Sequence, residues 1–144
     1  MKVPPIVAKA FREAVRARQK AHAPYSEFRV GAAFVSGRKV ISGCNVENAS
    51  YGGAICAERT AVVKAVSEGT TGPFSDLVVV AENTSGKPVA PCGLCLQVIA
   101  EFCPGTLRIW AGTPRGLESC FTLDQLMPVR FGRGDLKVGV RRKR

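Results

Sequence analysis

Apolar side chains in the first twenty residues recur at steps of three and four. After the tandem prolines at positions 4 and 5, these are Val7, Phe11, Ala14 and Val15, with charged residues between them. The spacing predicts an amphipathic helix that covers a core with one face. The helix is expected to end before Ala23-Pro24, because proline disfavours helical geometry in the residue that precedes it.

The middle of the chain alternates between strand-like and helix-like patterns. Apolar runs at residues 28–35 and 39–44 flank a Ser-Gly-Arg turn and predict a β-hairpin, and a polar loop follows at 45–53. A helix is predicted from Cys56 to about Glu68, where Gly69 is a suitable terminator. Its side chains leave almost no polar face, so we expect it to be buried. The apolar run 77–81 predicts an interior strand that is covered on both sides.

The last third of the chain continues this alternation. A helix is predicted from Cys92 to just before Pro104-Gly105, followed by strands at 107–110 and 119–122 and a short helix at 123–127. Residues 131–136 close the ordered part. This order of elements predicts a three-layer α/β/α fold around a mixed sheet of about five strands.

The length and the cysteine count limit the class of protein. A chain of 144 residues forms one domain that buries about two thirds of its unfolded surface, so it needs no disulfide bonds. The beginning of the chain shows no apolar secretory core and no run is long enough to span a bilayer, so we expect a cytoplasmic protein without a membrane partner. In a reducing compartment, a Cys-x-x-Cys pair is typical of metal binding.

The net charge of +10 would favour nucleic acid as a partner, but its distribution does not. Residues 1–20 and 137–144 each carry an excess of five positive charges, whereas residues 21–136 hold equal numbers of basic and acidic side chains. We therefore divide the chain into a single domain, 1–136, and a basic C-terminal tail, 137–144, that is predicted to be disordered.

Two short stretches carry the candidate chemistry, Cys56-Ala57-Glu58-Arg59 and Pro91-Cys92-Gly93-Leu94-Cys95. Three thiolates suit zinc, and three protein ligands leave one position for water. Glu58 can then shuttle protons for that water. Residues two apart in a regular helix point to nearly opposite sides, so Cys56 and Glu58 can serve one centre only at the very end of their helix.

The surroundings of these thiolates decide whether the site is catalytic or structural. Arg59 can donate hydrogen bonds to the sulfurs, and two helix N-termini would oppose their negative charge. A closed site with four cysteine ligands is the alternative. Cys103 is about 12 Å of helical rise beyond Cys95 and too far to share an ion. Cys44 and Cys120 remain open as a fourth ligand.

The chain resembles the small homotetrameric, zinc-dependent cytidine deaminases over roughly residues 10–136. The matching segments are Pro24-Tyr25-Ser26 with Phe28, Val30-Gly31-Ala32-Ala33, residues 45–52 from Asn45 to Gly52, residues 56–61 from Cys56 to Ala61, Pro91-Cys92-Gly93 with Cys95, and Leu126-Met127-Pro128 with Phe131. The resemblance implies a cytidine-deaminase-like fold. It also implies hydrolytic deamination of cytidine and 2′-deoxycytidine in pyrimidine salvage, with one Zn²⁺ per subunit and active sites at the interfaces of a homotetramer.

The same resemblance implies a role for each site residue. Cys56, Cys92 and Cys95 would hold the zinc, and Glu58 would protonate N3 of cytosine and then the leaving amine after water attacks C4. Substrate-binding roles would fall to the Ala57 N–H at the base carbonyl, Asn45 and Glu47 at the ribose 3′-hydroxyl, Phe28 beside the base, Tyr51, and Phe131 reaching into a neighbouring site. Without the family, Phe28 is equally well a core residue and Phe131 a C-terminal apolar plug. Leu96 stands where many members have arginine, so Arg59 would have to do more.

Three other functions stay open. Blasticidin S deaminases share this architecture, although the ribose-gripping pair favours an ordinary nucleoside. Polynucleotide-editing deaminases generally use His-x-Glu, whereas the single histidine here, His22, precedes Ala23-Pro24. The third alternative is not an enzyme but a binding module, in which zinc stabilises the fold and the basic ends of the chain bind nucleic acid.

Overall fold

The computed structural model describes residues 2–82 and 85–136. The predicted tail at 137–144 lies outside the described residues. Within them, no helix is long and apolar enough to cross a membrane.

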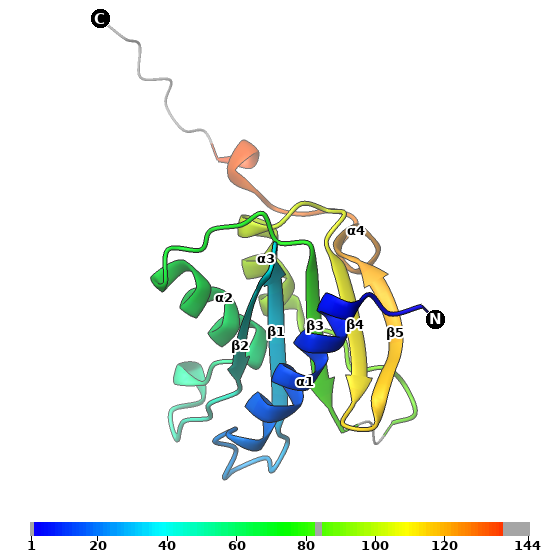
Figure 1. The fold of residues 1–144 in the computed structure, drawn as a ribbon. Coiled ribbons are helices and arrows are strands. Elements are labelled where there is room, and N and C mark those ends of the chain that lie inside the picture. The colour runs from blue at the N-terminus through cyan, green and yellow to red at the C-terminus, as the bar shows by residue number, and fades with distance from the viewer. Residues whose placement is uncertain (1, 83–84, 137–144) are drawn as a thin grey trace, which may run out of the picture.

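A five-stranded mixed sheet forms the centre of the domain (Figure 1). Its strands are β1 (Val30–Ser36), β2 (Lys39–Cys44), β3 (Asp76–Ala81), β4 (Arg108–Thr113) and β5 (Gly116–Thr122), in the spatial order β2-β1-β3-β4-β5. β3 and β4 are parallel, and the other neighbouring pairs are antiparallel. The mixed sheet of about five strands is therefore confirmed. β5 begins earlier than predicted because it pairs along the whole of β4 as a hairpin.

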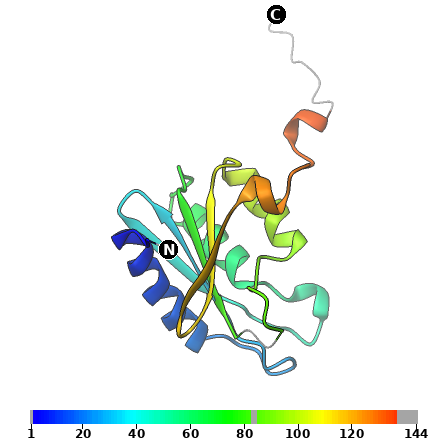
Figure 2. The same ribbon diagram turned by 90° about the vertical axis from the view of Figure 1, so that its right-hand side faces the viewer.

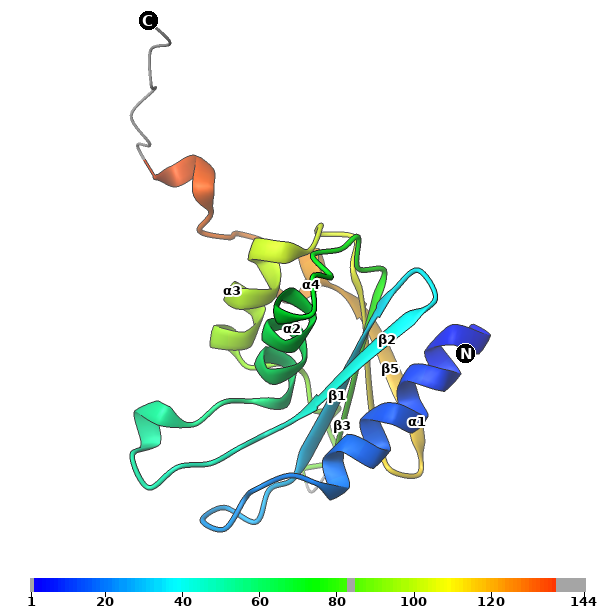
Figure 3. The ribbon, with the colours of Figure 1, turned by 60° about the vertical axis from the view of Figure 1, so that its left-hand side comes forward.

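Helices cover both faces of this sheet, which confirms the three layers. α1 (Pro5–Gln19) lies on one face, and α2 (Ala57–Ser67) and α3 (Gly93–Phe102) lie on the other (Figures 2 and 3). The short elements are α4 (Leu123–Leu126) and the 3₁₀ turns η1 (Tyr51–Gly53) and η2 (Arg133–Asp135). The core divides accordingly into one cluster under α2 and α3 and another under α1.

The helix after Cys56, predicted to be buried, is buried on one side only. α2 buries Ala57, Glu58, Ala61, Val62 and Ala65, but Val63 is 49% exposed and Val66 is 36% exposed in this chain. A helix that covers a sheet has only one face against it, so an apolar composition alone did not reveal the solvent-facing side.

Two glycines let the helices approach the sheet closely. An added Cβ at Gly31 would lie 1.9 Å from the carbonyl oxygen of Ala14 in α1, and one at Gly43 would lie 2.6 Å from the amide nitrogen of Ala61 in α2. Because no side chain fits at either position, the two helices pack directly on the backbone of β1 and β2. The second contact fixes the height of α2, and with it the position of its first turn.

Candidate metal centre and active site

Three cysteines from two helix starts form one group. Cys56 lies just before α2 with extended backbone angles (φ −75°, ψ 157°), and Cys92 lies just before α3 in a similar conformation (φ −68°, ψ 164°). Cys95 follows inside α3. The three Sγ atoms lie within 4.8 Å of one another. Sulfurs on a tetrahedral zinc would be about 3.8 Å apart, so the group fits this ion with little adjustment.

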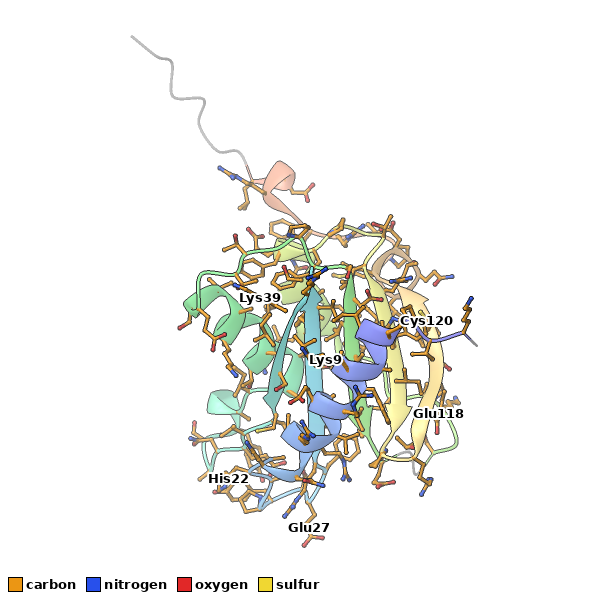
Figure 4. The ribbon with its side chains drawn as sticks, viewed as in Figure 1. Lys9, His22, Glu27, Lys39, Glu118 and Cys120 are labelled. Carbon is orange, nitrogen blue, oxygen red and sulfur yellow. The ribbon has the colours of Figure 1, made fainter. Side chains whose placement is uncertain are left out.

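No further potential ligand joins this group among the residues that the structure describes. Cys44 is in the edge strand β2, Cys103 is buried at the end of α3, and Cys120 is in β5, packed against the cluster under α1. His22 lies at the lower end of the molecule beside the loop that carries Glu27 and is exposed (Figure 4). The arrangement therefore matches a site with three protein ligands and not the closed four-cysteine alternative.

Glu58 is a buried carboxyl group in the first turn of α2, only 4% exposed. Burial, and next the nearby charge of Cys56, raise the pKa of Glu58 to about 7. A carboxyl group with such a pKa can both take up and release a proton near neutral pH. The predicted requirement is met, because Cys56 precedes the helix while Glu58 is within it, and both line the same cavity.

Arg59 is the basic side chain next to the sulfurs. Its Nη2 donates to the carbonyl oxygen of Ala54 at 3.2 Å and to Cys56 Sγ at 3.8 Å. Hydrogen bonds from Cys95, and next from Arg59, lower the pKa of Cys56 to about 5. Leu96 is 8% exposed and belongs to the core cluster under α2 and α3, so it brings no charge to the sulfurs.

A cavity of about 180 Å³ opens beside the sulfurs and Glu58. Its walls come from the loop before β1 and the first residue of β1, the loop after β2, the start of α2, β3 and the segment before α3. The lining residues are Ser26, Phe28, Val30, Asn45, Glu47, Cys56, Glu58, Val79, Val89, Ala90 and Cys92. The cavity thus combines apolar walls with two carboxyl groups, an amide, a hydroxyl and two thiols, which is the composition of a small-molecule site.

Comparison with known proteins decides the family. The model of the cytidine and deoxycytidylate deaminase zinc-binding region matches residues 6–111. The chain belongs to this deaminase family. Cytidine deaminases of Halalkalibacterium halodurans and Sporosarcina psychrophila are 45% and 46% identical to it, over 87% and 90% of this chain and 93% and 94% of theirs.

Comparison with solved structures gives the same family. A crystal structure of cytidine deaminase from Burkholderia pseudomallei superimposes with a TM-score of 0.80 at 44% identity, and the match covers 86% of this chain and 98% of that one. A blasticidin-S deaminase of Bacillus cereus is more distant, at 26% identity over 66% of this chain and 70% of its own. The matched family region is a zinc-binding one, and the three sulfurs fit one zinc ion per chain.

Two predicted substrate residues of this deaminase also hold its backbone together. Asn45 Oδ1 accepts from the Val30 amide at 2.8 Å, and Asn45 Nδ2 donates to the Phe28 carbonyl at 2.9 Å. Glu47 Oε2 accepts from the amides of Tyr25 and Ser26 at 2.9 and 3.2 Å. The loop that carries Phe28 is therefore built on these two side chains.

Three predicted substrate residues of the deaminase do not line the cavity. Tyr51 is 80% exposed, packs edge-on against Tyr25, and lines a second hollow of about 340 Å³ that shares Ser26 and Glu47 with the first. Phe131 is 59% exposed in the C-terminal segment, where its carbonyl accepts from Gln97 Nε2 at 2.9 Å. Ala57 is fully buried at the first position of α2.

Five residues of the cavity wall were not predicted as site residues: Ser26, Val30, Val79, Val89 and Ala90. Val30 is the first residue of β1 and stands in the Val-Gly-Ala-Ala segment of the family resemblance. Ser26 stands in the Pro-Tyr-Ser segment that carries the family resemblance, so a signal for it was present. Val79 is one of several similar residues in an apolar strand, and Val89 and Ala90 lie in a loop without a pattern. Only the packing of the two loops and β3 shows that these three face the site.

Proposed function

We propose that this chain catalyses the hydrolytic deamination of cytidine and 2′-deoxycytidine to uridine and 2′-deoxyuridine, with release of ammonia. The observation that carries the proposal is the buried Glu58 beside Cys56 in one cavity, with the three sulfurs of Cys56, Cys92 and Cys95 grouped at the helix starts. A water-activating centre and a proton carrier are the two components that displacement of an aromatic amine by water requires.

The chain's own residues supply the proton transfers. When bound by Cys56, Cys92 and Cys95, zinc supplies Lewis acidity that makes water reactive near neutral pH. Glu58 takes a proton from that water and delivers it to N3 of the base. It then takes the second proton from the hydroxyl now attached to C4 and passes it to the amino group, which leaves as ammonia while the C4 carbonyl forms. Its pKa near 7 suits both directions of transfer. The Arg59 guanidinium spreads the negative charge of the sulfurs through its contact with Cys56.

The cavity walls support a nucleoside as the substrate. Phe28 offers a flat apolar surface to a pyrimidine, and the Ala57 N–H, which has no partner inside the first turn of a helix, can donate to the base carbonyl. Asn45 and Glu47 together both donate to and accept from a sugar hydroxyl. These roles are supported by the presence of Phe28, Asn45 and Glu47 in the cavity wall.

A homotetramer with sites at its interfaces is part of the proposal. Val129 and Phe131 are 88% and 59% exposed, and the segment that carries them extends away from the domain (Figure 3). Tyr51 and Val63 expose further apolar surface. Large exposed apolar side chains of this kind favour surfaces that other chains cover. Gel filtration with light scattering tests this, and a monomer that is fully active would contradict it.

The proposal includes a compartment and a pathway, which the chemistry supports. All six cysteines are free thiols, and three of them must be thiolates to hold zinc, which suits the reducing cytoplasm. Return of the pyrimidine base as uridine supports a role in pyrimidine salvage. Partners are the free nucleosides; neither a membrane nor nucleic acid is required, and the neutral middle of the chain supports this.

The test follows the ultraviolet change that accompanies conversion of cytidine to uridine, with and without a zinc chelator. We expect turnover that the chelator abolishes and added zinc restores. Blasticidin S serves as the competing substrate, and a higher kcat/KM for it would contradict the proposal. Absence of all deamination, together with RNA binding that depends on the basic ends, would favour the zinc-stabilised binding module.

A further inference from the structure

The Ser26 hydroxyl connects two parts of the candidate site that come from different loops. Its Oγ donates a hydrogen bond to Glu47 Oε1 and accepts from the Phe28 amide at 3.0 Å. The amides of Tyr25 and Ser26 occupy the other oxygen of the same carboxylate. One glutamate therefore receives three hydrogen bonds from two consecutive residues, and the hydroxyl passes the connection on to Phe28.

The loop around Ser26 is held in a conformation that its sequence does not favour. Glu27 has a φ of 57°, in the left-handed region that residues other than glycine seldom adopt. Its side chain points away from the body of the molecule (Figure 4), so the side chain does not hold the backbone there. The hydrogen bonds on either side do, since Glu27 N donates to the Ala23 carbonyl at 3.1 Å and Ser26 bridges to Phe28. Strained residues of this kind persist where the surrounding contacts over-determine them.

The position of Ser26 relative to the two hollows gives these bonds a functional meaning. Ser26 and Glu47 are the two residues that line both the cavity next to Glu58 and the hollow next to Tyr51. The hydrogen bonds from Ser26 and then from Tyr25 keep the pKa of Glu47 below its usual range, so the carboxylate stays charged and fixed in one orientation. A sugar hydroxyl would meet an acceptor that is already aligned.

We propose that Ser26 is a positioning residue for the nucleoside, which ties the sugar-binding carboxylate of Glu47 to the backbone of Phe28 at the base. This inference rests on the proposed function, and it adds a residue to which no role had been given. Loss of the hydroxyl frees Glu47 Oε1 and leaves the Phe28 amide without its acceptor, so both contacts to the substrate become less well ordered. Glu58 and the sulfurs are not touched by the change.

The experiment compares Ser26→Ala, Ser26→Thr and the control Ser67→Ala, an exposed serine at the end of α2. Each is assayed with cytidine and with 3′-deoxycytidine, which lacks the hydroxyl that Glu47 would bind. We expect Ser26→Ala to raise KM for cytidine about tenfold while kcat changes by less than about threefold, because a hydrogen bond to a charged group is lost. The rise in KM for 3′-deoxycytidine should be several-fold smaller. Ser26→Thr should keep a KM for cytidine close to that of the wild type. The zinc content of all variants and the kinetics of Ser67→Ala should match the wild type.

Other outcomes overturn the inference. A fall in kcat with unchanged KM, an equal loss on both substrates, or wild-type kinetics in Ser26→Ala would each show that the hydroxyl does not act through Glu47. If Ser26→Ala does not fold, Ser26→Cys replaces it in the same assays, because cysteine is close to serine in size and its thiol is only a weak hydrogen-bond donor. A wild-type chain that deaminates neither nucleoside contradicts the proposed function itself, and the positioning role falls with it.

Discussion

Cys56 and Glu58 are two residues apart, and both line the cavity beside the metal group, because α2 begins between them. Cys56 has the extended backbone of a residue before a helix, whereas Glu58 is in the first turn. Had the helix begun one turn earlier, the two side chains would point to nearly opposite sides. The helix start therefore directs a cysteine sulfur and a buried carboxyl group to one cavity.

Replacement of Glu58 separates catalysis from zinc binding. We expect Glu58→Gln to lower kcat for cytidine by at least about a hundredfold, because an amide cannot carry protons between water and the base. Zinc content should stay at one ion per chain, since Glu58 is outside the group of three sulfurs. Ultraviolet assays and metal analysis on the same preparation check both statements. If the Glu58→Gln variant keeps a large part of the wild-type activity, Glu58 is not the proton carrier.

The three cysteines of the group should behave differently from the other thiols. Cys92→Ala leaves two sulfurs, so we expect loss of both zinc and activity. Cys120→Ala changes a half-buried thiol in β5, far along the chain from the group, and should keep both. Metal content per chain is the deciding measurement. Equal zinc loss in both variants would point to a general effect on folding.

Close packing of α2 on β2 predicts a steric effect at Gly43. An added Cβ would lie 2.6 Å from Ala61 N, so Gly43→Ala should lower the free energy of unfolding by about 1–3 kcal/mol. Activity should fall as well, because the helix that carries Glu58 must shift. Gly116→Ala is the matched control, since no atom lies within 4 Å of its added Cβ. Urea unfolding of both variants distinguishes a packing effect from a general cost of replacing glycine.

Replacement of Asp76 should lower the stability of the fold without changing catalysis. This fully buried carboxylate accepts from Trp110 Nε1 at 2.8 Å and from Arg108 Nη2 at 3.0 Å. Asp76→Ala leaves the buried indole N–H without its partner, so we expect a loss of roughly 3 kcal/mol in unfolding free energy. Asp76 begins β3 and is absent from the cavity wall, so KM for cytidine in the folded fraction should not change. A large rise in KM at low temperature would contradict this separation.

The pH dependence of Glu47 follows from its hydrogen bonds. Those from Ser26 and Tyr25 lower its pKa from 4.5, so the folded state holds this proton less readily than the unfolded chain. The contribution to stability is therefore present above about pH 4.5 and is lost as the pH falls through the lowered pKa. Carbon NMR of the Glu47 carboxyl should report a value below 4.5 in the wild type. In Ser26→Ala it should return toward 4.5, and an unchanged value would contradict the hydrogen-bond origin.

Local patterns in the sequence were enough to predict the order of the elements and the identity of the chemical groups. Helix and strand periods extend over several turns or residues, so α1, α3 and the interior strand β3 are recognisable without any tertiary contact. The thiols at 56, 92 and 95 are also recognisable, because their residue types and spacing are typical of zinc. The roles of the substrate-binding residues stay predictions, since they depend on a bound nucleoside.

The tertiary structure alone decided which of these groups meet. Glu47 contacts Tyr25 and Ser26 from more than twenty residues away, and Cys56 reaches Cys92 only because α2 and α3 begin at the same place beside the sheet. It also decided that Val63 faces outward in the single chain and that Phe131 lies outside the cavity. Such contacts depend on the packing of whole layers, in which every residue contributes, so no short stretch of sequence contains the information that sets them.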